Sequence, residues 1–312
     1  MAERPRALIA YDGSDVADDA IGAAARLLPD ADAVVVHVHD VSLSFEQSSL
    51  ARVALPDSVI AESARRYELA AREEAEAVAA KGVEVARAAG LAATAVVQDA
   101  GSAWRGICEA ARERSADVVV CGSHGRGGLA RAYLGSTSTS LLHRAPCPVL
   151  VVPPGRFDPG GPAVIGFDAS DGARAAVRSA ARLFPGRPTV VVHAWRSAVK
   201  RSLVGSALLA TPLDEVASIA RDIDELLAGN ASDVAEEGAA LARELGLTAS
   251  ARAVESADAA WRELAAAAES EGAAVAVVGS RGRGALASAV LGSVSSGLVH
   301  NAPLPVLVRR GR

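Results

Sequence analysis

The chain has 312 residues, half of them hydrophobic, and a formal net charge of −5 at pH 7. Aromatic residues make up only 3%, so Ala, Val and Leu supply most of the apolar content, which suits helices packed on a buried parallel sheet. The basic residues are scattered along an acidic chain, which argues against nucleic-acid binding.

The cysteines and the N-terminal residues indicate where the protein resides. Cys108, Cys121 and Cys147 are odd in number and never spaced as C-x-x-C, which argues against a disulfide framework or a zinc site. The first residues lack the apolar core of a signal peptide, and no apolar stretch reaches the roughly 18 residues that a membrane span needs. We therefore expect a cytoplasmic protein without a membrane partner.

Short aliphatic runs alternate with longer helical patterns along the first half. Because these runs are Val-rich and continuous, they are typical of strands that are covered on both faces. The alternation of strand and helix predicts an α/β fold with an open parallel sheet and right-handed crossovers. Ser14 or Asp15, Asp171 and Ser102 are expected to cap helices. The expected strands are residues 7–11, 33–38, 93–97, 118–121 and 149–152.

The chain repeats itself at a nearly constant offset. The segment that ends the first strand recurs in the second half, where Asp168 stands for Asp12 at an offset of 156 residues. Trp261 stands for Trp104 at an offset of 157 residues, and both indoles are expected to be core anchors beneath the third helix. The repeat predicts two copies of one structural unit.

A segment rich in Pro and Gly, residues 153–162, separates the two copies. It cannot sustain a helix or a central strand and is expected to be a linker, which places the domains at 1–155 and 156–312. Residues 42–57 and 196–212 lack clear periodicity, so we expect each to form a loop or lid of unassigned role.

After the fourth strand, both copies carry glycines in the spacing G-x2-G-x9-G-S. Glycines at the carboxyl end of a strand let the backbone approach a ligand closely, and a helix that begins at the last glycine offers N–H groups to a phosphate. Ligands of open α/β sheets sit at the carboxyl ends of strands, where the strand-1 aspartate also emerges. The motif residues are Gly122, Gly125, Gly135 and Ser136 in the first copy and Gly279, Gly282, Gly292 and Ser293 in the second.

On these residues, both halves resemble the universal stress protein family, apart from the linker and the loop after the second strand. The resemblance implies two tandem adenine nucleotide α-hydrolase-like domains, each an open parallel five-stranded sheet of order 3-2-1-4-5 with helices on both faces. It implies an intrachain pseudo-dimer, with residues 148–152 antiparallel to residues 305–309, and allows a further homodimer. The implied function is that of an ATP-binding sensor or regulator in the stress response, with or without Mg²⁺.

In ATP-binding members of the family, the strand-1 Asp lies near the adenine and ribose, and an apolar residue ending strand 2 packs on the adenine. Because Ala194 and Val294 replace Val38 and Thr137, we expect the second site to bind more weakly. Carried over, the first site consists of Asp12, Val38, Gly122, Gly125, Gly135, Ser136 and Thr137, and the second of Asp168, Ala194, Gly279, Gly282, Gly292, Ser293 and Val294.

Other functions stay open beside this one. Cyclic AMP is an alternative ligand, and a slow ATPase, a nucleotidyl-transfer enzyme or a nucleotide-free interaction scaffold is an alternative function. No catalytic residue is predicted, because no nucleophile shares a motif with a base. A dinucleotide fingerprint at residues 125–130 follows the wrong strand, and the chain has no Walker A sequence.

The histidines do not form a metal-binding pattern. His37 and His39 would share one face of a strand, but only His193 recurs in the second copy, so we expect packing or hydrogen bonding. His124 lies within the glycine loop and is replaced by Arg281 in the second copy. That replacement favours a phosphate-facing or solvent-exposed group over a catalytic base.

Overall fold

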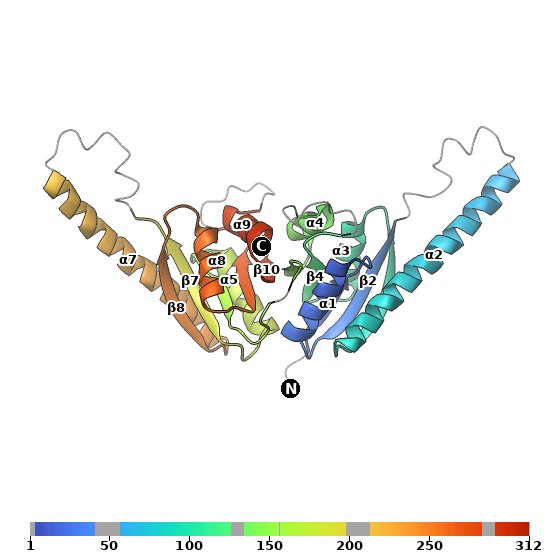
Figure 1. Ribbon diagram of the computed structural model, residues 1–312, viewed down its shortest axis with the longest axis horizontal. Coiled ribbons are helices and arrows are strands. Elements are labelled where there is room, and N and C mark those ends of the chain that lie inside the picture. Colours follow the sequence, from blue (N-terminus) through green and yellow to red (C-terminus); the bar gives the residue numbers. More distant parts are fainter. Residues whose placement is uncertain are drawn as a thin grey trace. The chain divides into compact units, whose positions relative to one another are not determined.

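The computed structural model describes residues 4–40, 57–125, 134–155, 157–197, 213–282 and 291–311. The chain divides into two compact units, residues 1–155 and 156–312. Each unit has three layers, in which a parallel five-stranded sheet lies between two layers of helices (Figure 1).

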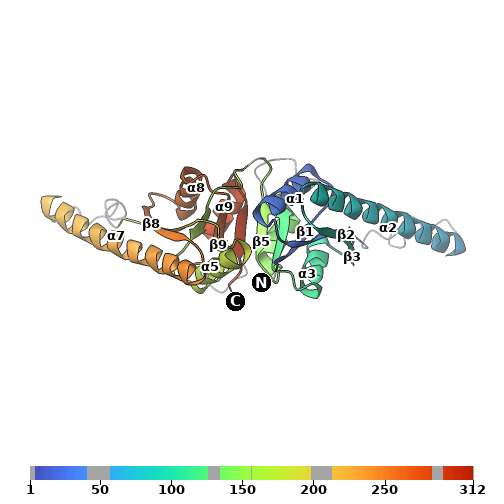
Figure 2. The ribbon, with the colours of Figure 1, turned by 90° about the horizontal axis from the view of Figure 1, so that it is seen from below.

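In the first unit the strand order is β3-β2-β1-β4-β5, and all neighbouring strands are parallel. Helices α1 and α2 cover one face, and α3 and α4 cover the other (Figure 2). The strand order reverses between β1 and β4, whose carboxyl ends therefore flank the switch point at which open sheets bind ligands. The elements are β1 (Arg6–Ala10), α1 (Asp15–Leu27), β2 (Asp32–Asp40), α2 (Asp57–Ala88), β3 (Ala93–Ala100), α3 (Ala103–Glu113), β4 (Val118–Gly122), α4 (Ser136–Arg144) and β5 (Val149–Val152).

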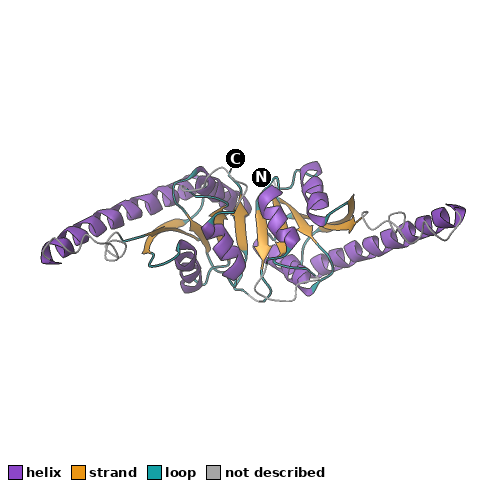
Figure 3. Ribbon diagram, turned by 90° about the horizontal axis from the view of Figure 1, so that it is seen from above, coloured by secondary structure: helices purple, strands orange, loops and turns teal. Residues whose placement is uncertain are grey.

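The second unit repeats this architecture with the strand order β10-β9-β6-β7-β8. Its sheet also lies between helices on both faces (Figure 3). The prediction of an α/β fold with two parallel five-stranded halves of order 3-2-1-4-5 is confirmed. The elements are β6 (Ala163–Gly166), α5 (Asp171–Leu183), β7 (Thr189–Trp195), α7 (Leu213–Glu244), β8 (Ala249–Glu255), α8 (Ala260–Ser270), β9 (Val275–Gly279), α9 (Ser293–Asn301) and β10 (Val306–Arg309).

The strands form the core, as their Val-rich sequences predict. Leu8 and Ile9 of β1 and their counterparts Val164 and Ile165 of β6 are almost completely buried. Strands β2 and β3 run further than the sequence indicates, because their ladder continues to the pair Asp40 and Ala100. The last residue pairs of this ladder include polar residues, so the sequence does not show that the strands continue.

Serine residues cap the first helix of each unit. The Ser14 and Ser170 hydroxyls accept hydrogen bonds from main-chain amides three residues ahead, at 3.3 and 3.2 Å. Asp15 and Asp171 are the first helical residues and not the caps, a position at which a negative charge still favours the helix dipole. Ser102 occupies the N-cap of α3 but makes no capping hydrogen bond with its side chain.

The predicted linker contains neither helix nor strand over its described part, residues 153–155 and 157–162. The Arg187 guanidinium fixes this part by donating to the carbonyls of Pro159 and Gly161, at 2.8 and 2.7 Å. Burial lowers the pKa of Arg187 below its ordinary value.

The segments expected to be loops or lids fall mostly on residues 41–56 and 198–212, which lie outside the described part of the chain. Only Arg196 and Ser197 of the second segment are described, and they belong to neither helix nor strand. Among the described helices, none is long and apolar enough to cross a membrane.

The tryptophans are not buried in the core as predicted, although the ring of Trp261 packs directly on Gly297 of α9. Trp104 and Trp261 begin α3 and α8 and remain partly exposed. The guanidiniums of Arg105 and Arg144 lie 5.2 and 4.7 Å from the ring centroid of Trp104, and that of Arg262 lies 5.3 Å from the ring centroid of Trp261. The indole faces are therefore used for cation–π contacts at the surface.

Candidate functional site

Asp12 and Gly125 meet at the carboxyl edge of the first sheet. Asp12 follows β1, and its Oδ1 accepts hydrogen bonds from the Ser14 amide at 3.0 Å and the Ser14 hydroxyl at 2.6 Å. A Cβ atom on Gly125 would overlap the other carboxylate oxygen, Oδ2. Two residues more than a hundred positions apart in the sequence are thus brought into contact beside the switch point.

The other two motif glycines join the end of β4 to the start of α4. The Gly135 amide donates to the Ser123 carbonyl at 2.7 Å, and the Ser138 hydroxyl donates to the Gly122 carbonyl at 2.7 Å. A Cβ atom on Gly135 would lie 3.2 Å from Cα of His124. The end of β4 with the two residues that follow it, Ser123 and His124, is therefore packed closely on the first turn of α4.

Helix α4 begins without a side-chain cap. Its N-cap residue, Gly135, has no side chain that could accept a hydrogen bond, and no side chain in the described part of the chain caps the first-turn amides. Ser136 is exposed and Thr137 is partly exposed at this end. Amides without a side-chain cap and the positive end of the helix dipole together suit an anion.

The second unit reproduces these contacts. A Cβ atom on Gly282 would overlap Oδ2 of Asp168, just as a Cβ atom on Gly125 would overlap Oδ2 of Asp12. The Gly292 amide donates to the Ser280 carbonyl at 2.7 Å, and the Ser295 hydroxyl donates to the same carbonyl at 3.1 Å. Gly292 is the N-cap of α9 and again offers no side-chain acceptor. The Ser293 side chain is exposed, and Val294 is partly exposed.

The motif glycines also have a packing role. A Cβ atom on Gly122 would lie 2.7 Å from Cγ1 of Val16, and one on Gly279 would lie 2.7 Å from the carbonyl carbon of Gly172. Both distances are shorter than real Cβ contacts. The spacing is therefore required for packing on the first helix of each unit, whether or not a ligand binds.

The predicted adenine contacts lie on strand 2 of each unit. Because β2 continues to Asp40, Val38 does not end its strand. The Val38 methyl groups would lie 2.9 Å from a Cβ atom on Gly106, so this side chain lies on the face covered by α3. Ala194 pairs with Val254 in the ladder of β7 and β8. Contact of Val38 or Ala194 with an adenine stays a prediction.

One histidine in each unit contacts the main chain directly after strand 1. Nδ1 of His37 lies 2.8 Å from the Tyr11 carbonyl oxygen, and Nδ1 of His193 lies 2.7 Å from that of Phe167. The expected hydrogen-bonding role of these histidines is confirmed. Within the described residues, no group of three or more His, Cys, Asp or Glu side chains could hold a metal ion.

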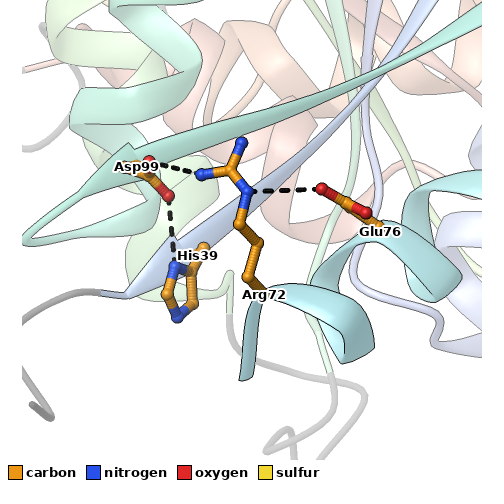
Figure 4. A network of polar contacts seen from close by, with 4 residues as sticks. All are labelled: His39, Arg72, Glu76 and Asp99. Carbon is orange, nitrogen blue, oxygen red and sulfur yellow. Dashed lines mark hydrogen bonds and ion pairs between the residues drawn. The ribbon is translucent and has the colours of Figure 1, made fainter. Parts of the chain in front are cut away.

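His39 of β2 belongs to a polar network that joins β2 and β3 to the middle of α2 (Figure 4). Its Nδ1 lies 3.1 Å from Asp99, Asp99 binds Arg72 at 3.2 Å, and Arg72 binds Glu76 at 3.3 Å. About half of the Arg72 and Asp99 side chains is exposed, so each pair contributes only about 0.2–1 kcal/mol. Ala228 stands at the position of Arg72 in the second unit, which therefore cannot form the same network.

The serine before His124 is a site feature that sequence reasoning missed. The Ser123 hydroxyl lies 3.0 Å from Nδ1 of His124. Its counterpart, the buried hydroxyl of Ser280, finds no hydrogen-bond partner in the described structure. Both serines directly follow the first motif glycine, so the sequence does show that this position is repeated. Their different hydrogen bonding was not predicted, because it depends on whether His124 or Arg281 follows.

The sequence profile of the Universal stress protein family matches residues 3–153 and again residues 161–310. The chain belongs to this family and carries two of its domains, as the motif predicts. It is 36% identical over 206 residues to Universal stress protein Rv2005c of Mycobacterium tuberculosis, a match that covers 62% of each chain. It is 34% identical over 203 residues to a universal stress protein of Mycolicibacterium smegmatis, with 64% of this chain and 63% of that protein covered. The chain thus spans less than two thirds of these relatives.

Solved structures show the same fold. A universal stress protein from Archaeoglobus fulgidus aligns over 99% of this chain and 100% of its own, with a TM-score of 0.58 and 16% identity. A putative universal stress protein from Pseudomonas aeruginosa aligns over 98% of this chain and 92% of its own, with a TM-score of 0.50 and 16% identity. At these identities the likeness shows the fold alone.

Proposed function

We propose that each unit binds an adenine nucleotide, ATP in the first place, at the carboxyl edge of its sheet. The observation that supports this most is the contact of Asp12 with Gly125, repeated between Asp168 and Gly282, beside an uncapped helix. The protein then serves as a nucleotide-dependent sensor or regulator in the stress response.

The two sides of this sheet edge suit different parts of a nucleotide. A carboxylate only accepts hydrogen bonds, so Asp12 suits the ribose hydroxyls or the adenine amino group and repels phosphate. The first-turn amides of α4 only donate, and they suit the phosphates. Mg²⁺, when it accompanies the nucleotide, would reduce the charge that these amides must compensate. The two repeated elements therefore fit opposite ends of one nucleotide.

This arrangement favours binding over catalysis. Amides that hold phosphates equally in substrate and transition state provide affinity without lowering a barrier. ATP hydrolysis, if present, is accordingly slow in this proposal.

Denaturing mass spectrometry of the purified protein tests the proposal directly. Co-purified ATP supports it, and co-purified cyclic AMP would assign the alternative ligand. A second assay follows thermal unfolding with added nucleotide, because a ligand that binds only the folded state raises the unfolding temperature. A protein that carries no nucleotide and gains no stability from ATP or cyclic AMP would be an interaction scaffold instead.

A further inference from the structure

The two units differ at the residue that adjoins the uncapped helix. In the first unit, Nδ1 of His124 lies 3.0 Å from the Ser123 hydroxyl. A Cβ atom on Gly135 would lie 3.2 Å from Cα and 3.8 Å from Cβ of His124. The His124 side chain thus begins beside the first turn of α4, and its Nδ1 is hydrogen-bonded to the Ser123 hydroxyl.

In the second unit, Arg281 occupies the equivalent place. A Cβ atom on Gly292 would lie 3.4 Å from Cα of Arg281, so its main chain adjoins α9 as that of His124 adjoins α4. Arg281 is partly exposed, and its side chain has no hydrogen bond or ion pair with any residue that the structure describes. The preceding residue, Ser280, is only 4% exposed, and its hydroxyl has no hydrogen-bond partner among the described residues either. Among the described residues, neither of these two donors has an acceptor.

We propose that the second unit selects nucleotides with a polyphosphate chain, and that Arg281 and Ser280 are the residues that set this selectivity. The inference rests on the proposed function, nucleotide binding, and adds that the two sites differ in the ligand charge they select. The first site, with His124 in place of arginine, discriminates less between ATP and AMP.

The physical reason is the permanence and shape of the guanidinium charge. Arginine carries a permanent charge and can form two parallel hydrogen bonds to one phosphate, which a histidine side chain cannot do. ATP carries more negative charge than AMP, so a fixed positive charge favours ATP. A hydrogen bond to a charged group changes affinity by about tenfold or more. A buried donor without an acceptor is also unfavourable, and an anionic ligand would satisfy it.

The test isolates each site by adding a negative charge at the other. Ser136→Glu blocks the first site, and Ser293→Glu blocks the second, because both serines are exposed first residues of the uncapped helices. Titration of ATP and AMP at pH 8 then gives the ratio of the AMP and ATP dissociation constants for one site at a time. We expect this ratio to be about tenfold larger in the second site.

Reciprocal exchange supplies the matched control. Arg281→His should reduce the AMP-to-ATP ratio of the second site until it equals that of the first site. His124→Arg should raise this ratio in the first site. Arg281→Lys should keep part of the selectivity of the second site. Ser280→Ala should weaken ATP binding, whereas Ser123→Ala should change it little. Equal ratios in the two sites, or ratios that the exchanges do not move, would overturn this inference alone. If neither AMP nor ATP binds to the wild-type protein, the proposed function fails and this inference fails with it.

Discussion

Gly82 of α2 lies directly against the ring of Tyr11. A Cβ atom at this glycine would come within 2.7 Å of Cδ1 of Tyr11 and of Cγ1 of Val35. The second unit repeats the relationship, since a Cβ atom on Gly238 would lie 2.6 Å from Cγ of Phe167. The long helix of each unit therefore packs closely over the end of strand 1, next to the aspartate of the candidate site.

This contact predicts opposite effects for the same substitution at two helical glycines. Gly82→Ala should lower the free energy of unfolding by about 1–3 kcal/mol, because the added methyl group overpacks the aromatic ring. Gly229→Ala in α7 should raise it by up to about 1 kcal/mol, because alanine favours helix and no atom lies within 4 Å. Urea denaturation measures both. Equal stability of the two variants would show that α2 does not pack as described.

The turn after strand 1 offers a second comparison between the units. Gly13 has φ of +79°, whereas Ala169 at the same place in the repeat has φ of +59°. Because a Cβ atom is strained at positive φ, Gly13→Ala should destabilise the protein by about 1–2 kcal/mol. Ala169→Gly should stabilise it by up to about 1 kcal/mol. Thermal unfolding of the two variants provides the check, and a loss of stability in both would argue against this turn geometry.

The buried thiol of Cys121 makes stability depend on alkaline pH. Burial raises the pKa of Cys121 from 9.0 to about 12, while a hydrogen bond with Ser138 acts in the opposite direction. The folded state thus keeps the thiol neutral while the unfolded chain ionises it, so this contribution is complete below pH 9.0 and is lost as pH rises toward 12. The free energy of unfolding should fall through this window, and less steeply in Cys121→Val.

Labelling with iodoacetamide tests the same burial. Cys121 should stay unmodified in the folded protein at pH 8 and react after unfolding in urea, because the thiolate is the nucleophile. Burial also raises the pKa of Cys108, which should be protected likewise. Rapid modification of Cys121 in the folded protein would contradict its burial in β4.

The last strand of each unit leads to a prediction about assembly. Within its own unit β5 is an edge strand, so a chain that ends after residue 155 would expose unpaired main-chain groups. Residues 1–155 expressed alone should therefore form a dimer through residues 148–152, the pairing that we predict with residues 305–309 in the full chain. Light scattering after size-exclusion chromatography measures the mass. A well-folded monomer at high concentration would contradict the pairing.

Much of the fold could be read from the sequence because its signals are local and duplicated. Val-rich runs marked the buried strands, and the offset between Asp12 and Asp168 marked the two units. The lengths of β2 and β3 could not be predicted, since pairing between the two strands, and not local composition, extends them to Asp40 and Ala100. The role of Trp104 depends on arginines that adjoin it only in the folded chain.

The candidate site was predictable in part for the same reason. Spacing alone identified the glycines and the aspartates, and parallel strands placed Asp12 beside Gly125. The packing role of Gly122 against Val16 required coordinates, because it depends on how α1 crosses β4. The unpartnered hydroxyl of Ser280 likewise became visible only when each hydrogen bond could be followed.

Calorimetric titration with ATP tests the central claim most directly. Wild type, Ser136→Glu, Ser293→Glu and the double variant should bind about two, one, one and no nucleotides, because an added carboxylate occupies the place of a phosphate. Ser136→Gln and Ser293→Gln keep the size of the side chain without its charge and should bind like wild type, and circular dichroism should show all variants folded. Binding of ATP by the folded double variant with wild-type stoichiometry, or no binding by wild type at millimolar ATP, would contradict nucleotide sites at these two helix ends.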